Sequence, residues 1–192
     1  PELIEHYTEY SGRMRPLPDW ILSGAVVGLQ GGTDKVLDVY EKLEALGTPV
    51  AALWLQDWVG QRETSFGTQL WWNWELDEDH YPGWDQLRER LERDDVRLMT
   101  YIGPWFADDV AQHKKNYHYS RNLFEEAERK GYLVKNREGE PYRVKTTDFS
   151  AAFVDLTNPE AREWIEDVIK EELIGSGASG WMADYGEGLP YD

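Results

Sequence analysis

The sequence predicts an α/β fold, the N-terminal half of a (β/α)8 TIM barrel with parallel strands. Continuous apolar runs alternate with segments whose apolar residues recur at the 3.6-residue period of a helix. Strands that are apolar on both faces are typical of parallel sheets covered by helices. A closed barrel takes on the order of 250 residues and eight β/α units, whereas about four units are visible here. A small open α/β domain is the alternative, but the half-barrel is favoured because the chain ends just past a strand that carries a candidate catalytic residue.

The first unit follows a stretch that is charged, punctuated by proline and aperiodic. Residues 1–22 are expected to connect an upstream domain to the half-barrel, which takes up residues 23–192. Residues 25–29 form the first apolar run, and Thr33 is predicted to cap the helix that follows. A second apolar run, 49–55, predicts a strand that is buried on both faces.

The third strand is predicted at residues 96–102, after a helix over residues 84–91. The chain is then expected to leave the barrel in an inserted excursion. This excursion contains a helix that begins after Ser120 and a hairpin-like segment at 132–142 with a Glu-Gly-Glu turn.

The chain returns to the barrel pattern near residue 153. Residues 153–156 predict a brief strand, and Asn158 followed by proline predicts the start of another helix. Residues 180–183 form the last predicted strand. The glycines at 175–180 match the spacing of a dinucleotide-binding loop, but they follow a helix and precede a strand, which is the reverse order, so we interpret them as a turn.

Charge and composition narrow the classes of partner. The chain carries 37 acidic and 20 basic residues, a formal net charge of −17, which argues against nucleic acid or an anionic membrane surface as a partner. No apolar run approaches the roughly 18 residues of a membrane span. The absence of cysteine fits a cytoplasmic location and excludes cysteine nucleophiles. An acidic, lysine-poor surface suggests a salt-adapted, halophilic host, and an ordinary acidic cytosolic protein is the alternative.

Polar side chains stand at the carboxyl ends of the predicted strands, where α/β folds place their sites. Gln30 follows the first strand, Gln56 and Asp57 follow the second, and Asp184 follows the last. A short apolar strand that delivers one carboxylate into a loop of Tyr, Gly and Glu predicts that Asp184 is a nucleophile or a base. The alternative is an aspartate that only caps the next segment.

The loop after the second strand is rich in tryptophan. Indole rings stack on the apolar faces of sugar rings, while amides and carboxylates bind hydroxyl groups, so these side chains at one mouth suggest a carbohydrate ligand. Most of the 10 tryptophans are expected to be packing residues, so the hypothesis depends on the cluster and not on any one of them.

Other chemistries lack a motif. No nucleophile elbow of the G-x-S-x-G type and no phosphate-binding P-loop occurs in the sequence. The acidic segment 77–80, and Asp108 and Asp109 with His113, could be drawn as metal ligands, but an acidic chain produces such clusters by chance. We therefore expect no metal and no cofactor, and none of the four histidines is placed like a catalytic base.

Three segments together resemble a known family. Residues 181–187, 154–159 and 54–58 are similar to the catalytic barrel of glycoside hydrolase family 31, the retaining α-glucosidases. The resemblance runs from about Gly28 to Asp192 and is strongest to the sulfoquinovosidase branch, which releases sulfoquinovose from sulfolipid derivatives. It implies an exo-acting glycosidase whose partner is a small-molecule glycoside.

The resemblance also implies roles for two aspartates. Asp184 matches the nucleophile, which forms a covalent glycosyl intermediate, and Asp57 matches a carboxylate that binds sugar hydroxyls. A retaining mechanism needs a second carboxyl group about 5 to 5.5 Å away. In this family it comes from a later strand, beyond Asp192, so the 192-residue chain is expected to be inactive without the remaining half of the barrel.

Sulfonate recognition in the sulfoquinovosidase branch uses residues that match Gln30, Gln56 and Trp72, together with an arginine whose position is occupied here by Gln69. An amide is a weaker, neutral donor to a sulfonate than a guanidinium. Arg62 lies a few residues earlier and is a candidate to compensate. The alternatives are a neutral-sugar α-glucosidase or α-xylosidase, a non-catalytic carbohydrate-binding relative, and an acidic α/β domain in which these residues do not converge.

Overall fold

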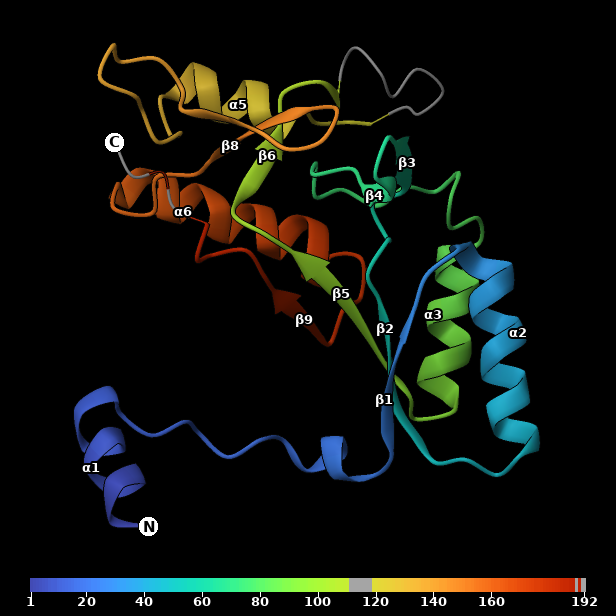
Figure 1. The fold of residues 1–192 in the computed structure, drawn as a ribbon. Helices are drawn as coiled ribbons and strands as arrows, with labels where there is room; N and C mark the ends of the chain where they lie inside the picture. Colours follow the sequence, from blue (N-terminus) through green and yellow to red (C-terminus); the bar gives the residue numbers. More distant parts are fainter. Residues whose placement is uncertain (111–118, 189, 191–192) are drawn as a thin grey trace.

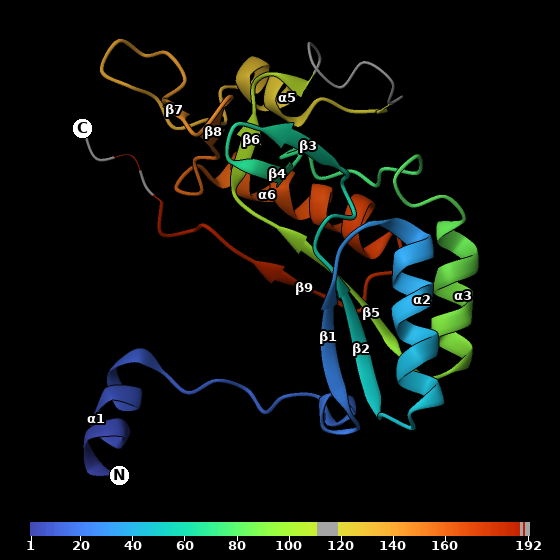
Figure 2. The same ribbon diagram turned by 45° about the vertical axis from the view of Figure 1, so that its right-hand side comes forward.

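A four-stranded parallel sheet organises the computed structural model, which describes residues 1–110, 119–188 and 190. Its strands are β1 (Ala25–Leu29), β2 (Val50–Leu55), β5 (Arg97–Ile102) and β9 (Gly180–Ala183), in the order β1-β2-β5-β9. Every neighbouring pair is parallel, and the strands fan out with their carboxyl ends toward the same side (Figures 1 and 2). The predicted partial barrel is confirmed.

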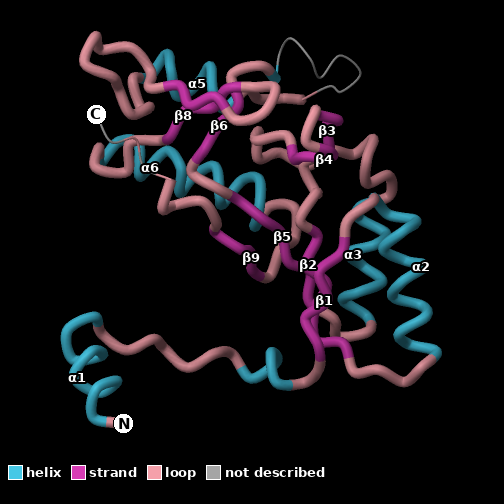
Figure 3. The backbone as a smooth tube through the Cα atoms, viewed as in Figure 1, coloured by secondary structure: helices cyan, strands magenta, loops and turns pink. Residues whose placement is uncertain are grey.

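Helices connect the strands of this sheet (Figure 3). They are α2 (Gly32–Ala45), α3 (Trp84–Arg93) and α6 (Pro159–Val168), the last continued by the π-helical turn η2 (Ile169–Ile174). The cap predicted at Asn158 is confirmed, because its side chain accepts from the backbone N–H of Glu160. The cap predicted at Thr33 is wrong. The helix begins after Gly31, which has a φ of 113°, and the Thr33 hydroxyl donates to the carbonyl of Pro82 across to the next unit.

The two inner strands of the sheet are buried as predicted, but the two outer strands are not. β2 and β5 are buried along most of their length, whereas Val26 in β1 and Met182 in β9 are 42% and 43% exposed. β1 and β9 each have one neighbouring strand among the described residues, so one edge and part of each face lack packing partners.

The excursion follows β5 and forms its own small layer, at the top of Figure 1. It contains β6 (Trp105–Ala107), α5 (Leu123–Lys130), β7 (Arg143–Lys145) and β8 (Ser150–Phe153). The three strands pair antiparallel in the order β6-β8-β7. Of the strand predicted at 153–156 only Phe153 lies in a strand, β8, and Val154 forms a bridge to Leu133, so these residues belong to the excursion and not to the barrel. An apolar run shows burial without showing which sheet buries it. The hairpin-like segment at 132–142 closes through a bridge between Lys135 and Pro141.

A second hairpin lies over the carboxyl ends of the barrel strands. β3 (Gln61–Thr64) and β4 (Gly67–Leu70) pair antiparallel around a short turn. The sequence predicted only a loop here, because both strands are short and polar and show no alternation of apolar residues. This hairpin becomes one wall of the candidate site.

The N-terminal residues stand apart from the sheet (Figure 1). They form α1 (Glu2–Ser11), which has no buried residue, and the short turn η1 (Asp19–Leu22) next to β1. An aperiodic connection was predicted, so α1 is a difference, although its position apart from the sheet is compatible with residues 1–22 connecting to another domain. Among the described residues no helix is long and apolar enough to cross a membrane.

Aromatic side chains dominate the core. As expected, most tryptophans are packing residues, and those that are buried are Trp58, Trp71, Trp74, Trp84, Trp105 and Trp164. Several donate their indole N–H to backbone carbonyls; for example, Trp58 donates to Tyr101 at 2.7 Å. Such contacts satisfy the polar end of a buried ring and fix its orientation.

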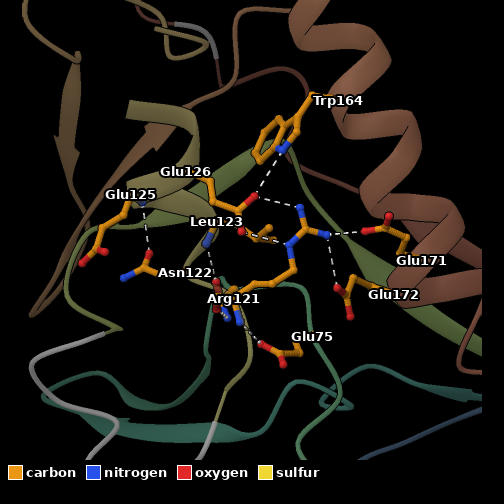
Figure 4. A network of polar contacts seen from close by, with 10 residues as sticks. Glu75, Arg121, Asn122, Leu123, Glu125, Glu126, Trp164, Glu171 and Glu172 are labelled. Atoms are coloured by element: carbon orange, nitrogen blue, oxygen red, sulfur yellow. Dashed lines mark hydrogen bonds and ion pairs between the residues drawn. The ribbon is translucent and has the colours of Figure 1, made fainter. Parts of the chain in front are cut away.

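A network centred on Arg121 fastens the excursion to the barrel helices (Figure 4). The guanidinium donates to Glu126 of α5 at 2.9 and 2.8 Å, and to Glu171 of η2 at 2.7 Å. Hydrogen bonding to Glu126 holds the pKa of Arg121 above its ordinary value. Burial, and then the nearby Glu75 carboxylate, raise the pKa of Glu172, to which Arg121 also donates.

Candidate active site

A cavity of about 200 Å³ opens at the carboxyl ends of β1 and β2, under the β3–β4 hairpin. Four predicted binding residues line it together: Gln30, Gln56, Gln69 and Trp72. The hypothesis in which Gln30, Gln56, Asp57, Trp72 and Asp184 do not converge is therefore wrong for Gln30, Gln56 and Trp72. Sequence reasoning missed the other lining residues, which are Gln61, Thr68, Leu70, Tyr101 and Tyr185.

Asp57 lies next to this cavity but does not line it. Its side chain is fully buried and accepts hydrogen bonds from the backbone N–H of Gly31 at 2.8 Å, from His80 Nε2 at 2.6 Å and from the hydroxyl of Tyr81. Burial acts to raise the pKa of Asp57, but these hydrogen bonds outweigh it and lower that pKa. The role predicted for Asp57 in binding sugar hydroxyls stays a prediction, and in this structure its oxygens already have protein partners.

His80 and Tyr81 were missed as site residues. His80 stood in a charged loop with no periodic signal, and the local sequence does not show that its ring reaches back to residue 57. The segment 77–80 was weighed as metal ligands, but Asp77 accepts from the backbone N–H groups of Asp79 and His80, which makes the segment a turn.

Three glutamines continue from Asp57 along the cavity wall. Gln61 Nε2 donates to Asp57 Oδ2 at 2.9 Å and to Gln30 Oε1 at 3.2 Å. Gln30 Nε2 in turn donates to Gln56 Oε1. The residues that follow two barrel strands and the first residue of β3 thus form a single hydrogen-bonded chain.

Asp184 follows β9 directly, as predicted. Its backbone N–H donates to the carbonyl of Ile102 at 3.0 Å, which extends the β5–β9 pairing by one residue. Its carboxylate accepts from the Tyr101 hydroxyl at 2.9 Å. Burial, and then the hydrogen bond to Asp184, raise the pKa of Tyr101, so this phenol stays a donor. Asp184 reaches the glutamine-lined cavity through Tyr101 and itself lines a neighbouring apolar cavity of about 250 Å³.

The residue after Asp184 has a strained backbone. Tyr185 has a φ of 60°, which is uncommon for a residue other than glycine. Its carbonyl accepts from the Trp105 indole at 3.1 Å, and its ring lies 5.8 Å from that of Trp72. Strain of this kind persists where surrounding contacts hold it, and it concentrates at functional sites. Tyr185 thereby turns the chain away immediately after the candidate nucleophile and closes the cavity beside Trp72.

Gln69 reaches the cavity from β4, where it is the cross-strand partner of Arg62. Its Oε1 accepts from the Thr147 hydroxyl at 3.0 Å. Arg62 is committed elsewhere. It makes two 2.8 Å hydrogen bonds to Asp109, and its guanidinium lies between the rings of Trp71 and Phe149. Arg62 is not among the cavity-lining residues, so the compensation considered for it has no support in this geometry.

No group of three or more His, Asp or Glu side chains is placed to hold a metal ion in the part of the chain that the structure describes. His113, which was weighed as a ligand, lies outside the described residues. A larger cavity of about 430 Å³ is lined mainly by carboxylates, among them Glu75, Glu171 and Glu172, and it lies apart from Asp184. It does not include any predicted site residue.

Comparisons with known proteins agree with this geometry. Residues 17–191 match the model of the glycosyl hydrolases family 31 TIM-barrel domain. The chain is 40% identical over 190 residues to the sulfoquinovosidase of Escherichia coli (strain K12), covering 99% of this chain and 26% of that protein. It is 36% identical over 192 residues to the sulfoquinovosidase of Agrobacterium fabrum, covering 100% of this chain and 27% of that protein.

The fold is similar to that of a solved relative. A family 31 sulfoquinovosidase from E. rectale, in complex with the aza-sugar inhibitor IFGSQ, superposes with a TM-score of 0.87 and 37% identity, covering 99% of this chain and 27% of that one. The chain thus spans about a quarter of the length of the relatives that it matches. From the matched barrel, the parallel sheet and the site at its carboxyl end, it follows that the chain belongs to glycoside hydrolase family 31 and forms part of its TIM-barrel domain.

Proposed function

We propose that the polypeptide carrying these residues is a retaining exo-α-glycosidase that acts on α-sulfoquinovosides. One observation carries the proposal: Asp184 stands at the carboxyl end of β9, hydrogen-bonded to a tyrosine that lines a cavity of amides and indole. The likeness to two sulfoquinovosidases over the whole chain supports the substrate class.

In the proposed mechanism Asp184 is the nucleophile. One of its oxygens bonds to the anomeric carbon while the bond from that carbon to the leaving oxygen breaks, and a second carboxyl group gives its proton to the leaving oxygen. Water then returns a proton to that second group and attacks the anomeric carbon, which releases Asp184. Tyr101 holds the carboxylate in place, because it donates to Asp184 Oδ2. The second carboxyl group is proposed to lie on a later barrel strand, so the remaining half of the barrel is a required partner.

The main alternative is a neutral-sugar α-glucosidase or α-xylosidase, and Gln69 favours it. Among the described residues no guanidinium lines the cavity, and Arg62 is neutralised by Asp109 at 2.8 Å. The sulfoquinovoside proposal therefore depends on neutral amide donors, in place of a guanidinium, to bind the sulfonate.

Replacing Gln69 with Arg tests which substrate the cavity prefers. We expect the ratio of kcat/KM for an aryl α-sulfoquinovoside to that for an aryl α-glucoside to rise by about tenfold or more, because a charge-assisted contact replaces a neutral one. The assay is hydrolysis of both glycosides by the full polypeptide. The matched control is Gln86→Arg in α3, which adds the same charge away from the cavity. A wild-type protein that cleaves only the glucoside, with a ratio unchanged by Gln69→Arg, would contradict the sulfonated substrate.

A cytoplasmic location and a salt-adapted host stay predictions from composition. Both follow from a chain with no cysteine and a formal net charge of −17.

A further inference from the structure

We infer that Asp57 acts as a positioning residue, which sets the direction of every hydrogen bond along the glutamine wall so that Gln56 offers an N–H donor to the cavity. This inference deepens the proposed function and rests on it, because it assumes that the cavity holds the glycoside. It gives Asp57 a different role from direct contact with the sugar.

The buried carboxylate of Asp57 fixes the direction of the hydrogen bonds that reach it. An ionised aspartate only accepts hydrogen bonds, and Asp57 is fully buried among donors from Gly31, His80 and Tyr81. His80 must therefore carry its proton on Nε2, and Gln61 must turn its Nε2 and not its Oε1 toward residue 57. An amide oxygen of Gln61 facing the Asp57 carboxylate would place two acceptors against each other and lose the hydrogen bond between these side chains, which is costly.

The amide direction of Gln61 fixes the directions of the next two glutamines. With Nε2 of Gln61 toward Asp57, the same nitrogen reaches Gln30 Oε1 at 3.2 Å. Gln30 must then present its own Nε2 to Gln56, whose Oε1 accepts. The amide of Gln56 is left with its N–H groups as the side it can offer to the cavity that it lines. The side-chain amides of Gln30 and Gln56 bond to each other and not to Asp57, and they are still oriented by it.

Gln69, which lines the same cavity from β4, also has its amide direction set, by a contact that does not involve Asp57. Thr147, in the turn between β7 and β8, donates its hydroxyl to Gln69 Oε1 at 3.0 Å. Gln69 therefore also has its amide N–H groups available, and its side chain makes no other hydrogen bond among the described residues. Two amide donors from β2 and β4 suit a sugar substituent that carries bare acceptor oxygens, such as an oxyanion, better than one that carries only hydroxyl donors.

The test is Asp57→Leu in isotopically labelled protein, with the side-chain amide NMR resonances of the glutamines as the readout. Oδ2 of Asp57 accepts from Gly31, His80 and Gln61, so the variant must remove the acceptor and not only its charge. Without this acceptor Gln61, Gln30 and then Gln56 are expected to lose their fixed direction. The amide signal of Gln56 should move although its side-chain amide bonds to Gln30 and not to residue 57, and that of Gln69 should stay. In hydrolysis assays KM should rise by about tenfold, with kcat within about threefold of wild type.

Two further variants keep the test decisive. Asp94→Leu is the matched control, since Asp94 also accepts from a tyrosine hydroxyl but lies at the end of α3, and it should leave the glutamine signals in place. Gln61→Leu removes the first link while Asp57 keeps its other donors, and it should move the signals of Gln30 and Gln56 even if Asp57→Leu fails to fold. An unmoved Gln56 signal in the folded variants would overturn the inference. Because the spectra need no substrate, a failure of the proposed glycosidase activity is seen separately, as absent hydrolysis by the wild type.

Discussion

Replacing Asp184 with Asn is expected to lower kcat by about 10⁴-fold or more, because an amide cannot form the glycosyl ester on which the retaining mechanism depends. The fold should survive. Asp184 pairs with β5 through its backbone N–H, and an asparagine oxygen can still accept from Tyr101. The measurement is single-turnover hydrolysis of an aryl α-sulfoquinovoside by the full polypeptide, together with its dissociation constant for the same glycoside.

Turnover by the wild type, measured beside the dissociation constants, separates two hypotheses for the protein. For an enzyme, Asp184→Asn should remove turnover and change affinity by less than about tenfold, since the nucleophile acts mainly in the transition state. For a non-catalytic carbohydrate-binding relative, wild type and variant would bind alike and neither would hydrolyse. The matched control is Asp155→Asn, an aspartate that follows β8 and accepts from Thr157 in a local turn. A kcat that falls equally in both variants would contradict the role of Asp184.

The barrel strands could be predicted from sequence because each is a short apolar run between helix signals. The runs that became β2 and β5 are buried as expected, and Asn158 begins α6 where its capping chemistry requires. The β3–β4 hairpin could not be predicted in this way. Its residues are polar, and it is held by contacts from distant segments, such as Asp148 with Ser65, that leave no local pattern.

The candidate site was predictable in position but not in detail. Carboxyl ends of parallel strands meet at one edge, and this placed Gln30 and Gln56 together. Gln69 and Trp72 were found only through the family resemblance, because they reach the cavity from the hairpin. His80 and Tyr81 bond to Asp57 from 23 and 24 residues along the chain, and only the packed structure reveals such pairs. Those pairs compensate the cost of burying the Asp57 carboxylate.

The ion pair between Arg62 and Asp109 predicts a large effect on stability. Both side chains are almost inaccessible, with 7% and 14% of their surfaces exposed, and the pair makes two 2.8 Å hydrogen bonds. Asp109→Asn leaves a buried guanidinium without its full counter-charge, and we expect the free energy of unfolding to fall by about 3 kcal/mol. Urea unfolding followed by tryptophan fluorescence measures this change.

The double variant Arg62→Met with Asp109→Leu tests the physical cause. Burial lowers the pKa of Arg62, and the hydrogen bond and charge of Asp109 only partly oppose this effect. Nη2 of Arg62 has no hydrogen-bond partner among the described residues. A buried pair of this kind can be exchanged for apolar side chains at little net cost, so the double variant should lose no more than about 1 kcal/mol. A double variant that loses as much stability as Asp109→Asn alone, or more, would show that Arg62 acts through its stacking on Trp71 and Phe149 and not through the pair. Gln69 lines the cavity and is the cross-strand partner of Arg62 in the hairpin. A disturbed Arg62 should therefore shift Gln69, so Asp109→Asn should also raise KM, and the double variant should bring KM back to the wild-type value.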